Sequence, residues 1–448
     1  MFIFQNQPTS VAVRNDKDFA RDDDDDDDDN ENDIVSDAGG TRRADGNDNV
    51  DVYEASRNTS LANAMTFTKR RVSYPVLRHQ QARLTARGNK ARWKEKARER
   101  GLNKEKVENA EMVRQGCMAV HWGIASVGKI SHDFTTALRT LPASEHEIVA
   151  AAARDLSRAQ SFSSLHKIKK AYGSYTELAK DKDIDIVYLG MLNPQHFETA
   201  KLMLDHGKHV LCEKPLTMNL KQTKELINLA KEKKLFLMEA IWSRCFPVYE
   251  TIKKEIDSGS IGQIHQVVVS FGFNMPDVQR LNLKSMGGGT VLDLGVYGIQ
   301  FACLVYNNDR PHTIRAAGCL NEEEVDQSVS ASLIYEGNRT ATIITHSLVD
   351  LPNEGYIIGT KGTIKVPNFW CPTTVELPSG TVNVPLPKGE HQFNFVNSAG
   401  LRYEADEARK CILAGLTESS KVPHSLSLLI AELEDEIRRQ VGVTYPED

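Results

Sequence analysis

Between residues 119 and 241 the chain alternates short apolar runs with amphipathic stretches, and this alternation constrains the fold most strongly. Apolar runs of about four to eight residues, separated by helices, are typical of βαβ units and a buried parallel sheet. The runs predict strands at 119–126, 147–153, 184–191, 208–213 and 235–239. The stretches between them predict helices at 130–141, 157–166, 195–206 and 216–233. We therefore expect an α/β domain over residues 118–241.

The turn after the first predicted strand has the spacing of a phosphate-binding loop. Residues 126–131 read Ser-Val-Gly-Lys-Ile-Ser, which keeps the middle glycine of G-x-G-x-x-G and places serine at the other two positions. That glycine lets the backbone approach a pyrophosphate, and the free N–H groups of the following helix bind anions. We predict a dinucleotide-binding Rossmann domain. The expected cofactor contacts of this turn are Ser126, Gly128, Lys129 and Ile130.

The end of the second predicted strand indicates which dinucleotide is bound. It reads Ala-Arg-Asp-Leu-Ser-Arg over residues 153–158. NAD enzymes usually place a carboxylate here for the ribose hydroxyls, whereas an arginine meets the 2′-phosphate of NADP. Arg154, with Ser157 and Arg158 in reach, therefore favours NADP. Asp155 is the competing carboxylate, and a solvated loop cation is the alternative for Arg154.

Two separated segments carry the candidate catalytic groups. An apolar strand runs into Glu213-Lys214-Pro215, where the proline biases Lys214 out of helical backbone and off the carboxyl edge of the sheet. Asp293 and Tyr297 are four residues apart, so on a helix they share one face. The alternatives are a solvated turn and an ordinary helix face.

An enzyme that oxidises an alcohol with a nicotinamide cofactor must take up the hydroxyl proton. A free tyrosine has a pKa near 10 and is a poor base at neutral pH, but a nearby cation stabilises its phenolate. We predict Tyr297 as acid/base, Lys214 as the cation that tunes and positions it, and Asp293 as electrostatic support. Lys214 as the proton acceptor is the alternative.

Other residues are expected around the same site. Asn193, His196 and Glu213 are candidate cofactor contacts, with a structural role as the alternative for His196. The candidate substrate contacts are His196, Trp242 and Phe271, although aromatic residues more often fill a core. We expect no arginine cluster beside Lys214 or Tyr297, which weighs against hydroxy-acid substrates. No metal site is expected.

From residue 242 onward the strands follow one another closely. Helices are predicted at 246–258, 290–305, 403–414 and 426–441. The predicted strands lie at 263–273, 313–319, 328–335, 339–347, 355–359 and 363–366. Strands separated by turns rather than helices form antiparallel or mixed sheets. We therefore expect a second, α+β domain over 242–448 with a large, mostly antiparallel sheet.

Residues 1–117 differ in composition from the rest of the chain. They contain eight consecutive aspartates, Asp22 to Asp29, and a basic stretch from about 69 to 106. Few apolar residues recur there at regular spacing, so we expect a disordered extension, with a charged helix possible only near 91–100. Whether the extension is a functional tail or an artefact of the gene prediction stays open.

Charge and cysteine usage limit the remaining classes of function. The net charge of −6 gives no reason to expect nucleic-acid binding by the body of the protein. Seven scattered cysteines without a C-x-x-C pair indicate free thiols in a reducing compartment. No apolar run was found that approaches the ~18–20 residues of a membrane span. The acidic amino terminus is unlike a targeting peptide, so we expect a cytoplasmic protein.

Several motifs together resemble the glucose–fructose oxidoreductase/inositol dehydrogenase (Gfo/Idh/MocA) family. The resemblance runs from about residue 118 to 448. It rests on the segments 122–128, 153–159, 171–175, 193–196, 210–215, 238–244, 287–289, 293–297, 359–362, 370–372 and 442–446. Many members of that family have histidine where this chain has Tyr297, whereas the branch that oxidises aromatic dihydrodiols and D-xylose has tyrosine.

The resemblance implies a function and an assembly. It implies an NADP-dependent dehydrogenase that oxidises a vicinal diol, such as trans-1,2-dihydrobenzene-1,2-diol to catechol or D-xylose to its lactone. It also implies a homodimer that forms through one face of the carboxy-terminal sheet. A non-catalytic NADP-binding sensor or scaffold of the same fold is the alternative. The sequence does not rank dihydrodiol, pentose and other polyol substrates.

Overall fold

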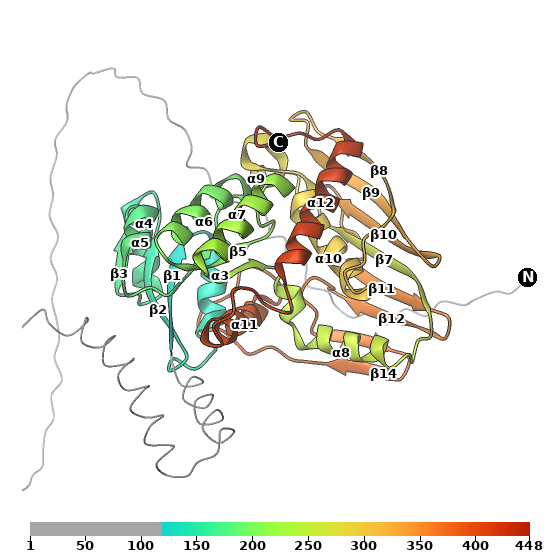
Figure 1. Cartoon of the computed structure of the whole chain (residues 1–448), viewed down its shortest axis with the longest axis horizontal. Coiled ribbons are helices and arrows are strands. Elements are labelled where there is room, and N and C mark those ends of the chain that lie inside the picture. Colours follow the sequence, from blue (N-terminus) through green and yellow to red (C-terminus); the bar gives the residue numbers. More distant parts are fainter. Residues whose placement is uncertain (1–118) are drawn as a thin grey trace, which may run out of the picture. The chain divides into compact units, whose positions relative to one another are not determined.

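The predicted parallel sheet is present in the computed structural model, which describes residues 119–448 (Figure 1). Six strands lie in the order β3-β2-β1-β4-β5-β6, and every neighbouring pair is parallel. The strands are β1 (Val120–Ala125), β2 (His146–Ala152), β3 (Lys170–Tyr172), β4 (Ile186–Leu189), β5 (His209–Glu213) and β6 (Leu237–Ala240). This order reverses between β1 and β4, where a doubly wound sheet opens a crevice at its carboxyl edge.

Helices connect these strands, as the alternating pattern predicted. They are α3 (Lys129–Leu138), α4 (Leu156–Leu165), α5 (Tyr175–Lys180), the short η1 (Asn193–Gln195), α6 (His196–Asp205) and α7 (Leu220–Lys233). The sequence did not reveal β3 and α5, because elements of three and six residues are too short to show a period. Helix α7 begins four residues later than predicted, where Asn219 caps it by accepting from the Gln222 N–H at 2.9 Å.

The second sheet has eight strands in the order β14-β13-β12-β11-β7-β10-β9-β8. Its strands are β7 (Ile264–Gly272), β8 (Thr313–Leu320), β9 (Asp326–Tyr335), β10 (Arg339–His346), β11 (Glu354–Gly359), β12 (Gly362–Pro367), β13 (Thr374–Leu377) and β14 (Gly380–Asn383). All neighbouring pairs are antiparallel except β7 and β10, which are parallel. The fold class expected from the sequence, a Rossmann domain followed by a mostly antiparallel sheet, is confirmed.

Helices cover one face of the large sheet and also reach the first sheet (Figure 1). The longer ones are α8 (Pro247–Asp257), α10 (Val296–Val305), α11 (Leu401–Leu413) and α12 (His424–Val441). The short ones are η2 (Trp242–Cys245), α9 (Gln279–Asn282), η3 (Lys284–Met286), η4 (Val291–Gly295) and η5 (Ser398–Gly400). Arg438 of α12 donates to the Met218 carbonyl at 3.1 Å, and Arg409 of α11 to the Glu145 carbonyl at 3.0 Å. The boundary between the two domains at residues 241/242, expected from the sequence, stays a prediction.

One helical stretch, Lys284–Val305, is long and apolar enough by length and composition to cross a membrane. The expectation that no such run exists is therefore wrong. Within the structure 94% of its apolar window is buried, as in the core helix of a folded domain.

The six cysteines of the described part of the chain are all free thiols. The expected disorder of residues 1–117 concerns a segment that lies outside the described residues, which begin at 119.

Acidic side chains are buried in the core beneath the β5–α7 turn. Glu213, Glu239, Glu404 and Glu434 are all at most 8% exposed. Burial is the first cause that raises the pKa of each of these carboxyls. Glu239 accepts from the Leu216 N–H at 3.0 Å and thereby fixes the turn that follows Lys214.

Replacing Glu239 by glutamine should weaken the pH dependence of stability. Burial raises the pKa of Glu239 from 4.5 to about 7. The folded state therefore binds this proton more tightly than the unfolded state does. Its stabilising contribution is present below about pH 4.5 and lost as the pH rises to about 7. A shift of this size corresponds to about 3 kcal/mol of unfolding free energy.

The measurement is the thermal midpoint of wild type, Glu239→Gln and the exposed α7 control Glu232→Gln at pH 5 and pH 8. We expect wild type and the control to lose stability between these values by equal amounts, and Glu239→Gln to lose distinctly less. Equal losses in all three proteins would contradict the assignment.

Candidate active site

The turn after β5 brings Lys214 against η4, the segment that precedes α10. Its Nζ lies 2.8 Å from Asp293 Oδ1 and 2.9 Å from the Asp293 carbonyl oxygen. The same Nζ stands 5.1 Å from the centroid of the Tyr297 ring. The structure thus brings together the three residues predicted as catalytic, at the carboxyl edge of the parallel sheet.

The backbone that carries Asp293 is wound differently from the predicted helix. Residues Val291–Gly295 form a π-helical segment, η4, and α10 begins only at Val296. Single π-turns inside helices are frequent at functional sites. Buried Asp326 supports the start of this segment: its Oδ2 accepts from Thr290 Oγ1 at 2.7 Å and from the Val291 N–H at 2.8 Å. No motif in the sequence marks Asp326, because its role depends on tertiary contact.

The Tyr297 hydroxyl has a different partner from the one expected. Trp242 Nε1 donates to it at 2.9 Å, whereas Lys214 lies over the ring. Burial, followed by the Glu213 and Asp293 carboxylates, raises the pKa of Tyr297 well above 10, and the Trp242 bond only opposes this rise. The expectation that Lys214 lowers this pKa is therefore wrong for the structure described. Tyr297 is a neutral phenol whose own proton can be donated.

Arg280, on the single turn α9, was missed entirely. Its Nη1 lies 2.9 Å from the same Asp293 Oδ1 that Lys214 contacts. Burial by itself would raise the pKa of Asp293, but Arg280 and Lys214 hold it well below its usual range. We expected no arginine cluster beside Lys214 or Tyr297, and one arginine, Arg280, reaches Asp293. The sequence does not show that the loop after β7 folds back onto η4.

The glycine-poor turn after β1 adopts the conformation that its motif requires. Ser126 has φ +73, a left-handed conformation in the place where the motif usually has its first glycine. A Cβ added to Gly128 would meet no atom within 4 Å, so space is open for a close approach to the backbone. Lys129 and Ile130 open α3 behind it, with their N–H groups at its amino terminus. A dinucleotide pyrophosphate fits this turn.

The end of β2 gathers further groups beside that turn. Arg154, Ser157 and Arg158 have exposed side chains. Asp155 caps α4 by accepting from the Ser157 N–H at 2.7 Å and from Ser157 Oγ at 2.9 Å. This carboxylate, which could have indicated NAD, is thus used within its own helix.

Tyr175 at the start of α5 belongs to the same group. Burial raises the pKa of its phenol, while Arg154, a hydrogen bond with Ser126 and Arg158 oppose the rise. These residues therefore converge at the edge formed by β1 and β2. Tyr175 lies in a motif that supported the family resemblance, but its sequence context gave no specific role.

The remaining cofactor candidates, Asn193, His196 and Glu213, form hydrogen bonds within the protein. Asn193 Nδ2 donates to the Gly287 carbonyl at 3.1 Å. His196 is completely buried, with Nδ1 2.8 Å from the Pro215 oxygen and Nε2 3.0 Å from the Met191 oxygen. This geometry favours the structural alternative for His196. Glu213 is buried and its Oε1 accepts from the Tyr188 hydroxyl at 2.6 Å.

Phe271 packs against Tyr297. Its ring centroid lies 5.7 Å from that of Tyr297 in an edge-on arrangement and 4.5 Å from that of Trp370. It is 2% exposed, which makes it a core residue that supports Tyr297. Trp242, the other predicted aromatic wall, touches the tyrosine hydroxyl directly.

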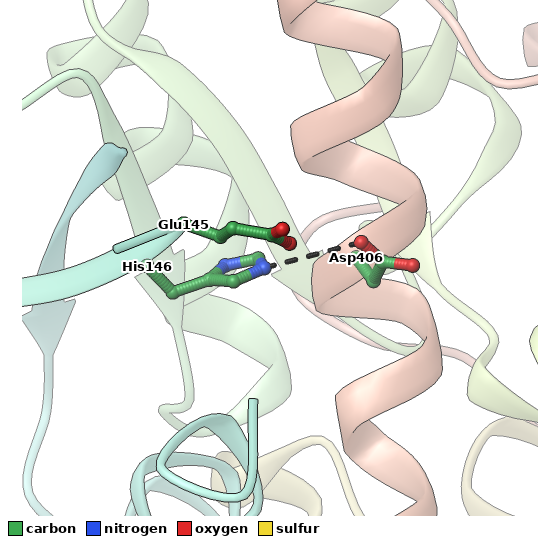
Figure 2. A group of neighbouring side chains, drawn as sticks. All are labelled: Glu145, His146 and Asp406. Carbon is green, nitrogen blue, oxygen red and sulfur yellow. Dashed lines mark ion pairs between the residues drawn. The ribbon is translucent and has the colours of Figure 1, made fainter. Parts of the chain in front are cut away.

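A separate group of possible metal ligands consists of Glu145, His146 and Asp406 (Figure 2). His146 Nδ1 accepts from the Trp122 indole N–H at 3.2 Å. A neutral imidazole that accepts at Nδ1 carries its proton on Nε2, the nitrogen that points toward Asp406 at 4.0 Å. A metal at Nε2 would have to displace that proton, which disfavours binding here.

The carboxylates of this group already have cationic partners. Arg409 Nη1 lies 3.5 Å from Glu145 Oε2, and Lys410 Nζ lies 2.6 Å from Asp406 Oδ2. Burial, despite the opposing Asp406 carboxylate, lowers the pKa of His146 to about 4. The group is therefore best described as a fixed contact between β2 and α11. The expected absence of a metal remains a prediction.

Comparison with known proteins agrees with this geometry. Residues 120–241 match the profile of an oxidoreductase family with an NAD-binding Rossmann fold, and residues 249–365 match the GFO/IDH/MocA C-terminal domain. The trans-1,2-dihydrobenzene-1,2-diol dehydrogenase of Danio rerio is 47% identical over 332 residues, which cover 74% of this chain and 99% of that protein. The Homo sapiens protein of the same name is 42% identical over equal shares.

Solved structures show the same fold at lower identity. A levoglucosan dehydrogenase in complex with NADH and levoglucosan has a TM-score of 0.64 and 19% identity, covering 72% of this chain and 98% of that one. The aldose–aldose oxidoreductase of Caulobacter crescentus has a TM-score of 0.63 and 21% identity over the same shares. Both profile matches and the curated relatives show that the chain is an oxidoreductase, with a nicotinamide cofactor, and that it belongs to the GFO/IDH/MocA family.

Proposed function

We propose that this protein oxidises a vicinal diol with NADP as the hydride acceptor, and that the substrate is a trans-dihydrodiol of an aromatic ring or a pentose such as D-xylose. The observation that carries the proposal is the contact set around Tyr297, with Trp242 at its hydroxyl and Lys214 over its ring. The names of the relatives at 47% and 42% identity support the dihydrodiol. A pentose presents adjacent hydroxyls on a similar six-membered ring.

Tyr297 is proposed as the group that exchanges a proton with the reacting hydroxyl. As a neutral phenol it is ready to donate to a carbonyl, and in the oxidative direction the phenolate takes the hydroxyl proton. The Trp242 N–H, bonded to the phenol oxygen at 2.9 Å, stabilises that phenolate. Lys214 and Asp293 form an ion pair that positions the tyrosine and the substrate. Lys214 as the proton acceptor remains the alternative.

NADP is proposed rather than NAD because of the residues at the end of β2. When bound, the nicotinamide would accept hydride from the carbinol carbon. Ser126 and Gly128 would hold the pyrophosphate at the amino terminus of α3. Arg154, Ser157 and Arg158 would bind the 2′-phosphate, since Asp155 is engaged in capping α4.

A homodimer in the cytoplasm is also proposed. The large sheet carries helices on one face, and its strands expose alternate side chains on the other, including Ile358 at 37%. Alternation of this kind leaves a face that a second copy can cover. No role in nucleic-acid or membrane binding is proposed for the described residues.

Tyr297→Phe should lower turnover by about two to four orders of magnitude, the range typical of general acid–base groups. Affinity for NADP should stay nearly unchanged, because the hydroxyl is bonded to Trp242 and is not needed for the dinucleotide. Wild-type oxidation should accelerate as the pH rises from 7 to 10, since the raised pKa of Tyr297 makes the phenolate scarce at neutral pH.

The assay follows NADPH formation with trans-benzene dihydrodiol, D-xylose, a phosphorylated sugar and a hydroxy acid. Lys214→Met is the comparison variant and should harm turnover and cofactor binding together. More than a third of wild-type activity in Tyr297→Phe would exclude Tyr297 as the acid/base. NADP binding without turnover of any alcohol would favour the sensor or scaffold alternative.

Arg154→Ala should weaken NADP binding while leaving NAD binding almost unchanged. Loss of a charge-assisted phosphate contact corresponds to roughly tenfold to a hundredfold in affinity. Titration of the protein with each dinucleotide, followed by fluorescence, provides the measurement. Arg139→Ala, on the far end of α3, serves as a control for loss of positive charge. Equal wild-type affinities for NADP and NAD would refute the preference.

A further inference from the structure

We infer that Asp326 is a positioning residue for the reaction: its carboxylate holds the π-helical turn of η4 in the form that presents Asp293 to Lys214. This inference rests on the proposed function, in which the Lys214–Asp293 pair positions Tyr297 and the substrate. It gives β9, a strand of the large sheet, a part in the reaction.

One oxygen of Asp326 holds two consecutive residues at the start of η4. Asp326 is the first residue of β9 and is 1% exposed. Its Oδ2 accepts from Thr290 Oγ1 at 2.7 Å and from the Val291 N–H at 2.8 Å. The first N–H groups of a helical segment have no partner within it, so a side-chain acceptor here fixes where the turn begins.

A second buried hydroxyl extends this contact to β10. Thr345 Oγ1 lies 2.8 Å from Thr290 Oγ1. Thr290 donates its single hydroxyl proton to the Asp326 carboxylate, so the proton between the two threonines comes from Thr345. The hydrogen bonds therefore run from Thr345 through Thr290 to Asp326, and the last of them is charge-assisted. Two neighbouring strands thus anchor the start of η4.

The other oxygen of Asp326 packs against the glycine turn that precedes η4. Gly289 has φ +109, and a Cβ added there would stand 2.5 Å from Asp326 Oδ1 and 3.0 Å from the Tyr445 hydroxyl oxygen. The Tyr445 hydroxyl donates to the carbonyl of Gly288. The absence of a side chain at Gly289 is therefore what allows the carboxylate to reach the turn.

The turn held by Asp326 carries the groups that bind Lys214. Asp293 lies two residues after Val291, and its carbonyl oxygen and Oδ1 accept from Lys214 Nζ at 2.9 and 2.8 Å. Because one of these acceptors belongs to the backbone, a shift of Val291 would move both of them away from the ammonium. A misplacement of about 1 Å can cost about a hundredfold in rate.

The strength of this hold depends on the charge of Asp326. Burial raises its pKa from 3.8 to about 6, although the hydrogen bonds that it accepts oppose the rise. The side chain is therefore charged at pH 8 and mostly neutral at pH 5. Tyr445 faces it from the carboxy-terminal segment, and the charged or ionisable side chains around Tyr445 are Glu434, Arg438 and Asp448. A neutral carboxyl accepts weaker hydrogen bonds than a carboxylate, so the hold on the turn weakens as the pH falls.

The experiment compares wild type with Asp326→Asn, Asp326→Ala and the control Glu324→Gln. Glu324 lies two residues before Asp326 and is exposed, where it pairs with Lys284 at 2.9 Å. The values of kcat and KM are measured from pH 5 to pH 9 with NADP and either trans-benzene dihydrodiol or D-xylose. Thermal midpoints show that each variant is folded, and deuterium exchange into residues 289–297 reports on the turn without substrate.

The ratio of the wild-type kcat to that of Asp326→Asn is the decisive quantity, because other pH-dependent groups affect both proteins alike. We expect a ratio of about threefold to tenfold at pH 8, the difference between a charged and a neutral acceptor, falling to about one at pH 5. Asp326→Ala should lower kcat by about tenfold to a hundredfold and accelerate exchange over the turn, with KM for NADP unchanged. Glu324→Gln should resemble wild type.

A wild-type to Asp326→Asn ratio that stays the same from pH 5 to pH 9 would overturn the inference and leave Asp326 as a residue of the fold alone. Exchange over 289–297 that is as slow in Asp326→Ala as in wild type would also overturn it. A wild type that oxidises no alcohol would overturn the proposed function, and the part of Asp326 in the reaction with it. Faster exchange in Asp326→Ala would in that case still support the hold on the turn.

Discussion

The ion pair between Lys214 and Asp293 is the interaction on which the site depends. It joins the end of β5 to the π-helical segment before α10, residues about eighty positions apart in the sequence, at 2.8 Å. Both side chains are largely buried, so loss of Asp293 would leave the Lys214 ammonium without its carboxylate, which is far costlier than losing an exposed pair. Loss of Lys214 would leave Asp293 paired with Arg280 alone. The pair therefore connects the carboxyl edge of the first sheet to the segment that precedes α10.

Buried acidic side chains near this ion pair influence the pKa of Tyr297. Glu213 and Glu404 each raise the pKa of Tyr297, while Trp242 opposes them. The phenol is thus held neutral near neutral pH. The sequence alone suggested one cation, Lys214, as the main influence on this phenol. The site instead balances several charges around one hydroxyl group.

Much of this arrangement could be read from the sequence, and the failures have physical causes. The strands of the first sheet show as apolar runs because both faces are buried, and Lys214, Asp293 and Tyr297 stood in recognisable motifs. Arg280 and Asp326 could not be found in this way, because each acts through a loop or strand end that only the tertiary fold brings to η4. The Trp242 contact was missed for a related reason: an aromatic residue in an apolar context predicts packing, whereas the indole N–H has a polar role.

The π-helical segment limits where residues can be inserted into or deleted from this chain. An α-helix turns by about 100° per residue, so one residue added to or removed from Val291–Gly295 would rotate every later side chain of α10 by that angle. Tyr297 would then leave the Lys214 ammonium and the Trp242 indole together, although no catalytic residue had been substituted. The number of residues in this segment is therefore as important for the site as the identity of its residues. Insertions would be tolerated only outside the stretch between the glycine turn and Tyr297.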